Sequence, residues 1–449
     1  MIVLKFGGTS VESKAAIARV AEIVRERLSE QPVVVVSAMG KSTNRLLAAA
    51  EESAAGRRDE AQRLLDELEA FTREQAAPEL ASFIDIHYQE LSAFLDELTQ
   101  IGEFPPQYVD LISSYGERLS SKIVAVAFQN LGINSVHVDA REVIITDRRH
   151  TQAAPLSPRT YAKCAAIVAP LAQLGKVVVL GGFIGSTQDG FTTTLGRGGS
   201  DFSAALIGAG IGAKEIQIWT DVDGMLTCDP RILPGGHRVK VISFAEAAEL
   251  AYFGAKVLHP ATVLPAVEKN IPVRILNSRN PSSEGTRIVA DSVPSANVVK
   301  SIACKRGITL LNIRSMRMLM AHGFLHKIFE TFNRYETSVD MISTAEVSVS
   351  LTIDNTTHLT SIVADLSRIA EVTVAENVSI VCLVGEGIQR TPGVAAAALG
   401  ALRDTNVHMI SQGASLLNVS IVVDETALPA AVERLHREFF STLDHEVFE

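Results

Sequence analysis

The sequence contains 449 residues, of which 47% are hydrophobic and 20% charged, and its formal net charge is −10. This composition is typical of a soluble globular chain with two or three domains, and the acidic balance argues against a nucleic-acid partner. No uninterrupted apolar run approaches the roughly 20 residues of a membrane span, and the N-terminus lacks the apolar core and cleavage site of a signal peptide. The four cysteines have no CxxC spacing. They predict neither a disulfide framework nor a zinc site, and they favour a cytoplasmic protein.

The chain opens with a short apolar strand, residues 2–6, which is interrupted by Lys5 and followed at once by Gly7 and Gly8. A helix with apolar residues at helical spacing is expected next. A strand, a glycine loop and a helix together can hold phosphate, because glycines let backbone N–H groups approach an anion and the helix start adds positive potential. Lys5 can also be read as a charged edge residue. Its place beside the glycines favours the phosphate interpretation.

The second predicted strand, residues 32–37, is apolar up to Ser37, as in a parallel sheet covered on both faces. Residues 40–42 imitate the tail of a Walker A loop, but the first glycine of that motif would fall at Val35, which excludes a P-loop NTPase. Ser37 and Thr43 remain as polar groups at the carboxyl end of a strand, where open α/β sheets bind ligands.

A charged helical segment is predicted from about residue 46 to residue 98, as a cover for the sheet or a subunit contact. A further helix is expected after Gly116 and Glu117. Glu117 would then lie in a first helical turn, where the helix dipole favours a solvated glutamate.

The central feature is residues 192–201, TTTLGRGGSD, between a strand at residues 176–186 and an Ala/Leu/Ile-rich helix. We expect Ser200 or Asp201 to cap that helix. Arg197 among the glycines offers a planar fork for a carboxylate or a phosphate. A simple glycine-rich turn is the alternative, but a second glycine loop beside Lys5 favours an anion site.

Further strands are predicted at residues 216–220 and 271–275, with a helix at 246–253 between them. Alternating strands and helices indicate an αβα sandwich with a mainly parallel sheet, assigned to residues 1–290. Beyond it, a βαββ pattern occurs twice, at residues 300–376 and 377–449, with VDMIS at Val339 matched by VHMIS at Val407. This internal repeat predicts two small ferredoxin-like domains that can form paired small-ligand pockets.

The motifs KFGGTS, GGFIGS, TTTLGRGGSD, WTDVDG, DPR and FGAKVLHPAT closely resemble those of the aspartokinases, in the amino-acid kinase family. The resemblance covers nearly the whole chain, and the C-terminal repeat is similar to the paired ACT domains of the monofunctional, lysine-sensitive kind. No fused homoserine dehydrogenase is expected.

The resemblance implies transfer of the γ-phosphoryl group of ATP to the side-chain carboxylate of L-aspartate. The product is 4-phospho-L-aspartate, on the route to lysine, threonine and methionine. A carboxylate is already ionised at neutral pH, so no general base is needed. The protein must instead hold two anions together and neutralise the transferring phosphoryl group, with Mg²⁺ accompanying ATP. No protein metal site is expected.

By this resemblance Lys5 and Asp201 are catalytic, with Asp201 holding Lys5 in place. Arg197 would bind the α-carboxylate of aspartate and Glu117 its ammonium group. The expected substrate-binding residues are Ser37, Thr43, Glu117, Arg197 and Ser200. The expected nucleotide-binding residues are Lys5, Phe6, Gly7, Gly8, Thr220, Asp221, Leu226, Arg231, Lys256 and Val257. Leu226 stands where related enzymes often have tyrosine, so stacking on the nucleoside would be lost there.

The resemblance also implies a lysine pocket in the first ACT-like domain, with Asp340 and Glu346 facing the two ammonium groups of lysine. The expected pocket residues are Met318, Gly323, Phe324, Leu325, Val339, Asp340, Thr344 and Glu346. Ala321 and Ala345 stand where lysine-sensitive relatives tend to have serine. Loss of two hydroxyl hydrogen bonds could weaken lysine binding by roughly 5- to 150-fold.

Two alternatives stay open. One is a related kinase that acts on glutamate or acetylglutamate, and the other is a non-catalytic amino-acid sensor that keeps the kinase fold. Pairing of the edge-rich repeats predicts a homodimer or homotetramer through the ACT domains.

Overall fold

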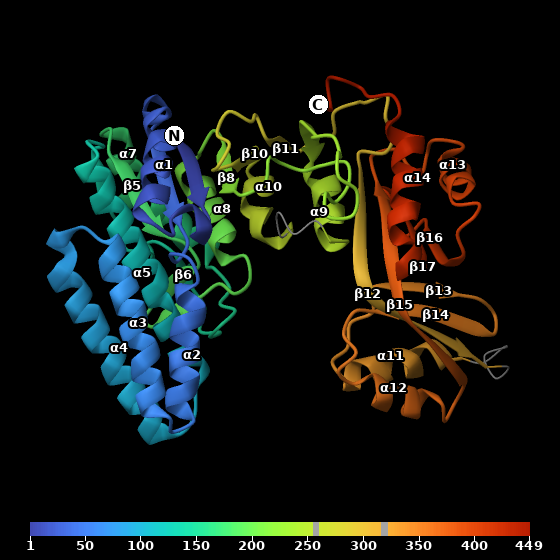
Figure 1. The fold of residues 1–449 in the computed structure, drawn as a ribbon, viewed down its shortest axis with the longest axis horizontal. Helices are drawn as coiled ribbons and strands as arrows, with labels where there is room; N and C mark the ends of the chain where they lie inside the picture. Colours follow the sequence, from blue (N-terminus) through green and yellow to red (C-terminus); the bar gives the residue numbers. More distant parts are fainter. Residues whose placement is uncertain (255–259, 316–321) are drawn as a thin grey trace. The chain divides into compact units, whose positions relative to one another are not determined.

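The computed structural model describes residues 1–254, 260–315 and 322–449 (Figure 1). These residues form two compact units, Met1–Met225 with Leu258–Asp291, and Leu226–Val257 with Ser292–Glu449. Residues 226–257 thus belong to the second unit, although the sequence pattern places them within the first 290 residues. Among the described residues, no helix combines the length and the apolar character that crossing a membrane requires.

The first unit is built on a mainly parallel sheet, as predicted. Its strands lie in the order β3-β5-β2-β1-β8-β10-β11, and only β11 runs antiparallel to its neighbour β10. The strands are β1 (Ile2–Phe6), β2 (Pro32–Val36), β3 (Ser135–His137), β5 (Val177–Gly181), β8 (Ile216–Thr220), β10 (Val273–Asn277) and β11 (Thr286–Val289). A small second sheet, in the order β4-β6-β7, contains β4 (Ile145–Thr146), β6 (Ile184–Thr187) and β7 (Thr192–Thr194).

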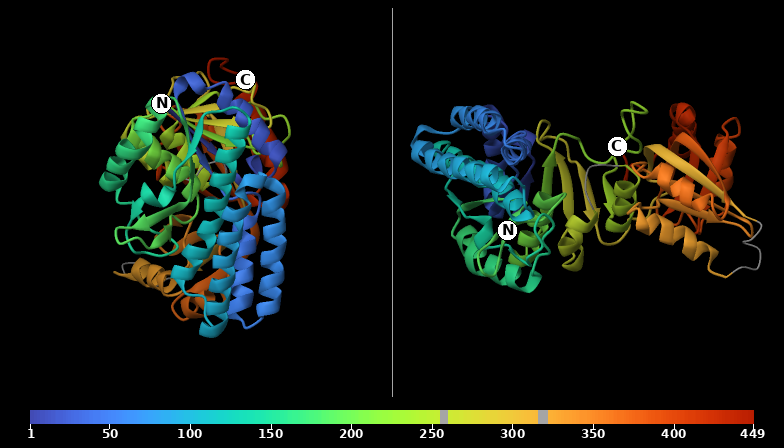
Figure 2. Two further views of the ribbon diagram at one scale, coloured as in Figure 1. Left: turned by 90° about the vertical axis from the view of Figure 1, so that its left-hand side faces the viewer. Right: turned by 90° about the horizontal axis from the view of Figure 1, so that it is seen from below.

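Helices cover this sheet and extend beyond it. They are α1 (Lys14–Arg25), α2 (Ser42–Ala54), α3 (Arg58–Gln75), α4 (Ala81–Ile101), α5 (Pro106–Asn130), α6 (Ser157–Lys163), α7 (Ala169–Gln173), α8 (Gly199–Ile211) and α10 (Leu264–Glu268). The long helices α2 to α5 lie side by side in Figure 1 and in both views of Figure 2, and their apolar faces form one core. The helical cover predicted between residues 46 and 98 is therefore α2, α3 and α4.

The alternation of side chains along β1 determines which residue reaches the site. Ile2, Leu4 and Phe6 are buried in the core shared with α1 and α2 to α5. Val3 faces the other side of the sheet, where a Cβ at Gly208 of α8 would lie 3.6 Å from the Val3 side chain. Because strand side chains alternate, Lys5 shares the face of Val3 and points toward α8.

The second unit contains an antiparallel six-stranded sheet in the order β13-β14-β12-β15-β17-β16. Its elements are β9 (Val241–Ser243), α9 (Phe244–Tyr252), β12 (Ser301–Arg314), α11 (Phe324–Arg334), β13 (Met341–Thr344), β14 (Ser348–Ile353), α12 (Leu359–Leu366), β15 (Glu371–Val384), α13 (Val394–Ala401), β16 (Val407–Gln412), β17 (Asn418–Asp424) and α14 (Leu428–Phe440). The predicted βαββ repeat is present, with one further helix after each copy.

The two repeats share their first strands. Residues 309–314 of β12 pair with β14, residues 378–384 of β15 pair with β17, and β12 and β15 pair with each other along their length. Each 14-residue strand therefore contributes to both halves of the sheet. The domain boundary expected between residues 376 and 377 falls inside β15.

Candidate active site

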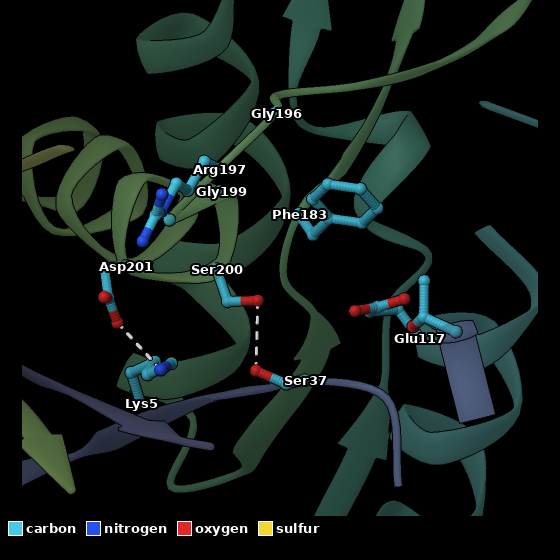
Figure 3. A pocket seen from close by; sticks show the side chains of 11 residues that line it. Lys5, Ser37, Glu117, Phe183, Gly196, Arg197, Gly199, Ser200 and Asp201 are labelled. Atoms are coloured by element: carbon cyan, nitrogen blue, oxygen red, sulfur yellow. Dashed lines mark hydrogen bonds and ion pairs between the residues drawn. The ribbon is translucent and has the colours of Figure 1, made fainter. Parts of the chain in front are cut away.

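One cavity of about 500 Å³ in the first unit brings together residues from five separate parts of the sequence (Figure 3). It lies at the carboxyl ends of β1 and β2 and at the start of α8. All the predicted substrate-binding and catalytic residues line it, namely Lys5, Ser37, Thr43, Glu117, Arg197, Ser200 and Asp201. Phe183 and the glycines of the 196–199 loop complete the lining.

Lys5 and Asp201 form an ion pair at the sheet side of the cavity. Their Nζ and Oδ1 atoms are 2.8 Å apart, and the two side chains are only 13% and 15% exposed. Lys5 comes from the strand and Asp201 from the first turn of α8, so the pair joins the sheet to this helix. A lysine ammonium held in this way is a fixed positive charge directed at the cavity.

The glycine loop before α8 differs from the prediction in its cap. The N-cap residue is Gly198, with a positive φ of 72° and no side-chain cap, so the expectation that Ser200 or Asp201 caps the helix was wrong. A left-handed backbone at this position favours glycine because it has no Cβ. Ser200 and Asp201 lie within the first turn instead, and their side chains face the cavity. The Ser37 and Ser200 hydroxyl oxygens are 3.0 Å apart.

Glu117 lies in the middle of α5, and not in a first helical turn as the sequence predicted. The residue is only 4% exposed, and burial raises the pKa of its carboxyl to about 8, partly opposed by the hydrogen bond from the Ala38 N–H. That N–H is 3.1 Å from Oε1, while Oε2 is buried without a hydrogen-bond partner among the described residues. A buried acid with one unsatisfied oxygen is suited to receive a cationic group.

Gly116 explains how α5 approaches the sheet so closely at this point. A Cβ built on Gly116 would lie 2.7 Å from the Cβ of Ala38 and 3.2 Å from Oγ1 of Thr43. Only glycine allows this contact without displacement of its neighbours. The neighbouring residue Glu117 is thereby brought against the end of β2.

Phe183 is a residue of the cavity that sequence reasoning missed. Its φ is +67°, an uncommon value for a bulky residue, and its N–H donates to Oγ of Ser203 at 2.9 Å. Its ring lies in the cavity between Arg197 and Glu117 in Figure 3. The GGFIGS motif contained this residue, but its side chain carries no charge or nucleophile that would mark it.

The residues expected to bind nucleotide are distributed over both units. Phe6 is buried and stacks on Trp219, with ring centroids 5.9 Å apart, and the Gly7 N–H donates to the Trp219 carbonyl at 3.4 Å. Thr220 is the last residue of β8, the strand beside β1, and its hydroxyl forms a hydrogen bond of 3.2 Å with Asp221, the next residue.

Two further nucleotide candidates belong to the second unit, and two lie outside the described residues. Leu226 is half-buried, and its carbonyl accepts a hydrogen bond from Ser301. Arg231 is exposed and bonded to Asp229 at 2.7 Å. Lys256 and Val257 are outside the part of the chain that the structure describes. No group of three or more His, Cys, Asp or Glu side chains in the described ranges is arranged to hold a metal ion.

The expected lysine-pocket residues lie in the second unit, except Met318, which with Ala321 lies outside the described residues. Gly323, Phe324 and Leu325 form the start of α11, and Val339 and Asp340 precede β13. Thr344, Ala345 and Glu346 are exposed at the turn between β13 and β14.

Asp340 already has a cationic partner within the chain. Its Oδ1 is 2.7 Å from Nζ of Lys305, which is also 2.7 Å from Oδ2 of Asp354. Burial raises the pKa of Asp340, and its Oδ2 is buried without a hydrogen-bond partner among the described residues.

Comparison with known families identifies the class of protein that this fold and site define. The amino acid kinase family matches residues 1–277, and an ACT domain matches residues 381–439. The first match alone covers more than half of the chain. The chain therefore belongs to the amino acid kinase family.

Individual relatives narrow this assignment. The chain is 38% identical to aspartokinase 2 (chloroplastic) of Arabidopsis thaliana, over 98% of this chain and 84% of that protein. It is 37% identical to lysine-sensitive aspartokinase 3 of Escherichia coli, over 98% and 99%. The structure resembles E. coli aspartokinase III in complex with lysine and aspartate, with a TM-score of 0.86 and 35% identity over 98% of this chain and 99% of that one. It also resembles the same enzyme in complex with aspartate and ADP, with a TM-score of 0.81, 35% identity, and coverage of 98% and 100%. Within its family, the chain belongs to the aspartokinases.

Proposed function

We propose that the chain transfers the γ-phosphoryl group of ATP to the side-chain carboxylate of L-aspartate, giving 4-phospho-L-aspartate. One observation carries the proposal. A single cavity contains a lysine fixed by an aspartate, an arginine on a glycine loop and a buried glutamate with one unsatisfied oxygen. A related enzyme solved with aspartate and ADP supports the choice of both substrates.

In the proposed mechanism the zwitterionic end of aspartate lies between two charged residues. The Arg197 guanidinium binds the α-carboxylate, and Glu117 accepts hydrogen bonds from the α-ammonium group through its unsatisfied oxygen. Ser37, Thr43 and Ser200 supply hydroxyl groups in the same cavity. The side-chain carboxylate of the substrate then attacks without a general base, since it is ionised at neutral pH.

Lys5 stabilises the negative charge of the transferring phosphoryl group, and Asp201 holds its ammonium in position. Thr220, Asp221, Leu226, Arg231, Lys256 and Val257 are the proposed nucleotide contacts, together with residues 5–8. Among the described residues that line the cavity, Asp201 is paired with Lys5 and Glu117 is buried, so the donor set fits Mg²⁺ that binds chiefly through ATP phosphates and water. Such an ion would supply further charge neutralisation at the phosphates.

We propose that lysine inhibits the enzyme through the pocket formed by Gly323, Phe324, Leu325 and Met318 with Val339, Asp340, Thr344 and Glu346. A related enzyme solved in complex with lysine supports this ligand. The ion pair between Lys305 and Asp340 means that a bound lysine would share this carboxylate with Lys305.

We propose further that the protein is a homodimer or a homotetramer joined through its six-stranded sheets. Both edge strands of this sheet carry an exposed isoleucine, Ile342 on β13 and Ile410 on β16, which are 37% and 41% exposed. Among the described residues, β13 and β16 each pair with one neighbouring strand, and a strand edge with apolar side chains favours pairing with another chain. Light scattering after size-exclusion chromatography measures the state directly, and a monomer at micromolar concentration contradicts this part of the proposal.

A coupled assay for ADP release tests the reaction itself. ATP is supplied with aspartate, glutamate or N-acetylglutamate as the only acceptor, and hydroxylamine traps the acyl phosphate. We expect activity with aspartate as the acceptor and none with glutamate or N-acetylglutamate. Activity with another acceptor would favour a different amino-acid kinase, and binding of an amino acid without turnover would favour a sensor.

A further inference from the structure

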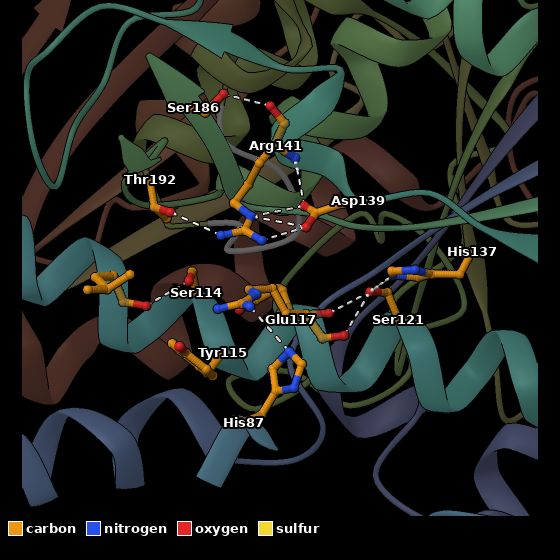
Figure 4. Close-up of polar contacts among 12 residues, drawn as sticks. His87, Ser114, Tyr115, Glu117, Ser121, His137, Asp139, Arg141, Ser186 and Thr192 are labelled. Carbon is orange, nitrogen blue, oxygen red and sulfur yellow. Dashed lines mark hydrogen bonds and ion pairs between the residues drawn. The ribbon is translucent and has the colours of Figure 1, made fainter. Parts of the chain in front are cut away.

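The three threonines of β7 each form a hydrogen bond with a different side chain. Nη1 of Arg141 donates to Oγ1 of Thr192 at 3.2 Å, a contact drawn in Figure 4. The Thr193 hydroxyl is 2.7 Å from that of Thr146, and the Thr194 hydroxyl donates to Oδ1 of Asp110 at 2.5 Å. None of these threonines lines the cavity, yet their strand leads directly into the loop that carries Arg197.

Asp110, like Thr193, is fully buried. It is 0% exposed and lies on α5 seven residues before Glu117, which is about two helical turns, so both residues occupy one side of the helix. Besides Thr194, its carboxylate accepts the Thr151 N–H at 2.9 and 3.0 Å, and its Oδ2 is 2.7 Å from Nδ1 of His150. A buried carboxylate is costly unless such bonds are kept, so the contacts fix their partners in place.

Thr151 links Asp110 to the glycine loop. Its φ is +69°, which is strained for a β-branched residue. A Cβ built on Gly196 would be only 3.2 Å from the Thr151 carbonyl, so this segment packs against the loop beside Arg197. The Ala153 N–H also donates to the Thr194 carbonyl at 2.9 Å. Asp110 therefore holds both the strand before the loop and the segment beside it.

We infer that Asp110 is a positioning residue for recognition of the amino-acid substrate. It anchors β7, and the loop after β7 that carries Arg197, to α5, the helix that carries Glu117. It thereby sets the distance between Arg197, which binds the α-carboxylate, and Glu117, which binds the α-ammonium group. The inference rests on the proposed function, because it assigns Arg197 and Glu117 to aspartate. Loss of the anchor should weaken aspartate binding more than ATP binding, because the anchored loop carries Arg197. Neither Asp110 nor Thr194 lines the cavity, so the effect is transmitted through the position of that loop.

Adjacent threonines provide a matched test. Thr194→Val and Thr193→Val each replace a buried hydroxyl on the same strand with a methyl group, at positions 2% and 0% exposed. We expect Thr194→Val to raise the KM for aspartate about tenfold or more, because a charge-assisted bond is lost. The KM for ATP should stay within about twofold. Thr193→Val and Thr194→Ser should resemble the wild-type enzyme, and the latter keeps the hydroxyl that Asp110 requires.

Asp110→Ala supplies a second variant because it removes the oxygen that accepts from Thr194, and the double variant Asp110→Ala with Thr194→Val should be no weaker in aspartate binding than Asp110→Ala alone. Thermal unfolding of every variant separates misfolding from lost recognition, and calorimetric titration with aspartate gives a readout without turnover. Equal effects of Thr193→Val and Thr194→Val, or equal rises in both KM values, would overturn the inference. A wild-type enzyme that neither binds nor phosphorylates aspartate overturns the proposed function and, with it, this inference.

Discussion

Glu117 carries a pH dependence that follows from its burial. Its pKa of about 8 means that the carboxyl is largely protonated at neutral pH before the substrate binds. Pairing with a substrate ammonium requires the ionised form, so aspartate must displace a proton below pH 8. Figure 4 shows how the helix around it is held, with the Ser121 hydroxyl donating to the Glu117 carbonyl at 2.7 Å.

The first prediction is therefore that aspartate affinity rises with pH. Between pH 6.5 and 7.5 the KM for aspartate should fall by up to about tenfold, and it should level off above pH 8. Calorimetric titration at pH 7 in buffers of different ionisation enthalpy should detect release of about one proton. Glu117→Gln should bind aspartate weakly at every pH without this step. A pH-independent KM in the wild-type enzyme would show that Glu117 does not meet the ammonium group.

Lys5 gives a second prediction at the same scale. Lys5→Ala removes the fixed charge of the cavity, and the turnover rate should fall by about 100-fold or more, as when other preorganised charges are lost. Lys41→Ala is the matched control, because Lys41 is exposed and does not line the cavity. Initial rates at saturating substrates measure both. Near-normal turnover in a folded Lys5→Ala protein would remove the catalytic assignment.

The third prediction concerns Arg197, where a substitution should affect aspartate binding and leave ATP binding unchanged. Arg197→Lys keeps the charge and loses the bidentate fork, which is not a conservative change at a carboxylate site. The KM for aspartate should rise about tenfold or more, while that for ATP stays within about twofold. A rise in the KM for ATP alone would assign Arg197 to the nucleotide instead.

Lys5 and Arg197 could be predicted from the residues themselves, because both stand beside glycines that can bind an anion, whereas Glu117 entered the expected site only through the resemblance to the aspartokinases. Phe183 could not be predicted, since its role depends on a positive φ that only the folded chain imposes. Asp110 was missed for a similar reason. Its partners, Thr151 and Thr194, lie 41 and 84 residues away in the sequence.

At the scale of elements, α5 shows where local propensity gives the wrong answer. Gly116 suggested a break before a new helix, but α5 runs through it for 25 residues. Glycine weakens a helix by only about 1 kcal/mol, and packing readily outweighs that cost. The close approach to Ala38 requires glycine at this position, so the residue that suggested a helix end is the one that lets the helix dock.

The fourth prediction compares two helical glycines. Gly116→Ala should lower both thermal stability and aspartate binding, because its Cβ would lie 2.7 Å from that of Ala38. Gly400→Ala, in α13, should be neutral or stabilising by up to about 1 kcal/mol, since a Cβ there meets nothing within 4 Å. Thermal unfolding and KM measurements on both variants make the comparison. Equal destabilisation by the two changes would contradict this account of Gly116.

The strands of the second unit show a different limit of sequence reasoning. Apolar runs at residues 308–313 and 379–385 predicted short strands, whereas β12 and β15 each extend over 14 residues. Their remaining halves carry polar residues such as Lys305 and Glu371, which pattern analysis does not assign to strands. The polar half of each strand pairs with the apolar run of the other strand, so the pairing joins the two repeats. Neither repeat alone contains both partners of this long-range pairing.

At the scale of the whole molecule, the cavity residues belong to the first unit and the proposed lysine-pocket residues to the second. Inhibition by lysine therefore requires a coupling free energy between two sites, which is typically about 1–3 kcal/mol. Lysine can supply it only by binding the inhibited conformation more tightly than the active one. Bound lysine can rearrange the ion pair between Lys305 and Asp340, because an ammonium group of the ligand competes with the Lys305 ammonium for the Asp340 carboxylate.

The last prediction is that lysine inhibits the enzyme and threonine alone does not. A diamino acid can pair with Asp340 and Glu346 together, whereas the neutral side chain of threonine leaves one carboxylate without a partner. Ala345 lacks a hydroxyl group, so half-inhibition should need more lysine than in a relative with serine there.

Activity titrated against each amino acid, at aspartate near its KM, measures this response. Glu346→Ala should abolish it. Glu376→Ala is the matched control, since Glu376 is an exposed glutamate of the same unit that lies outside the proposed pocket, and it should respond as the wild-type enzyme does. Inhibition by threonine but not by lysine, or an unchanged lysine response in Glu346→Ala, would show that the second unit recognises a different ligand or binds lysine elsewhere.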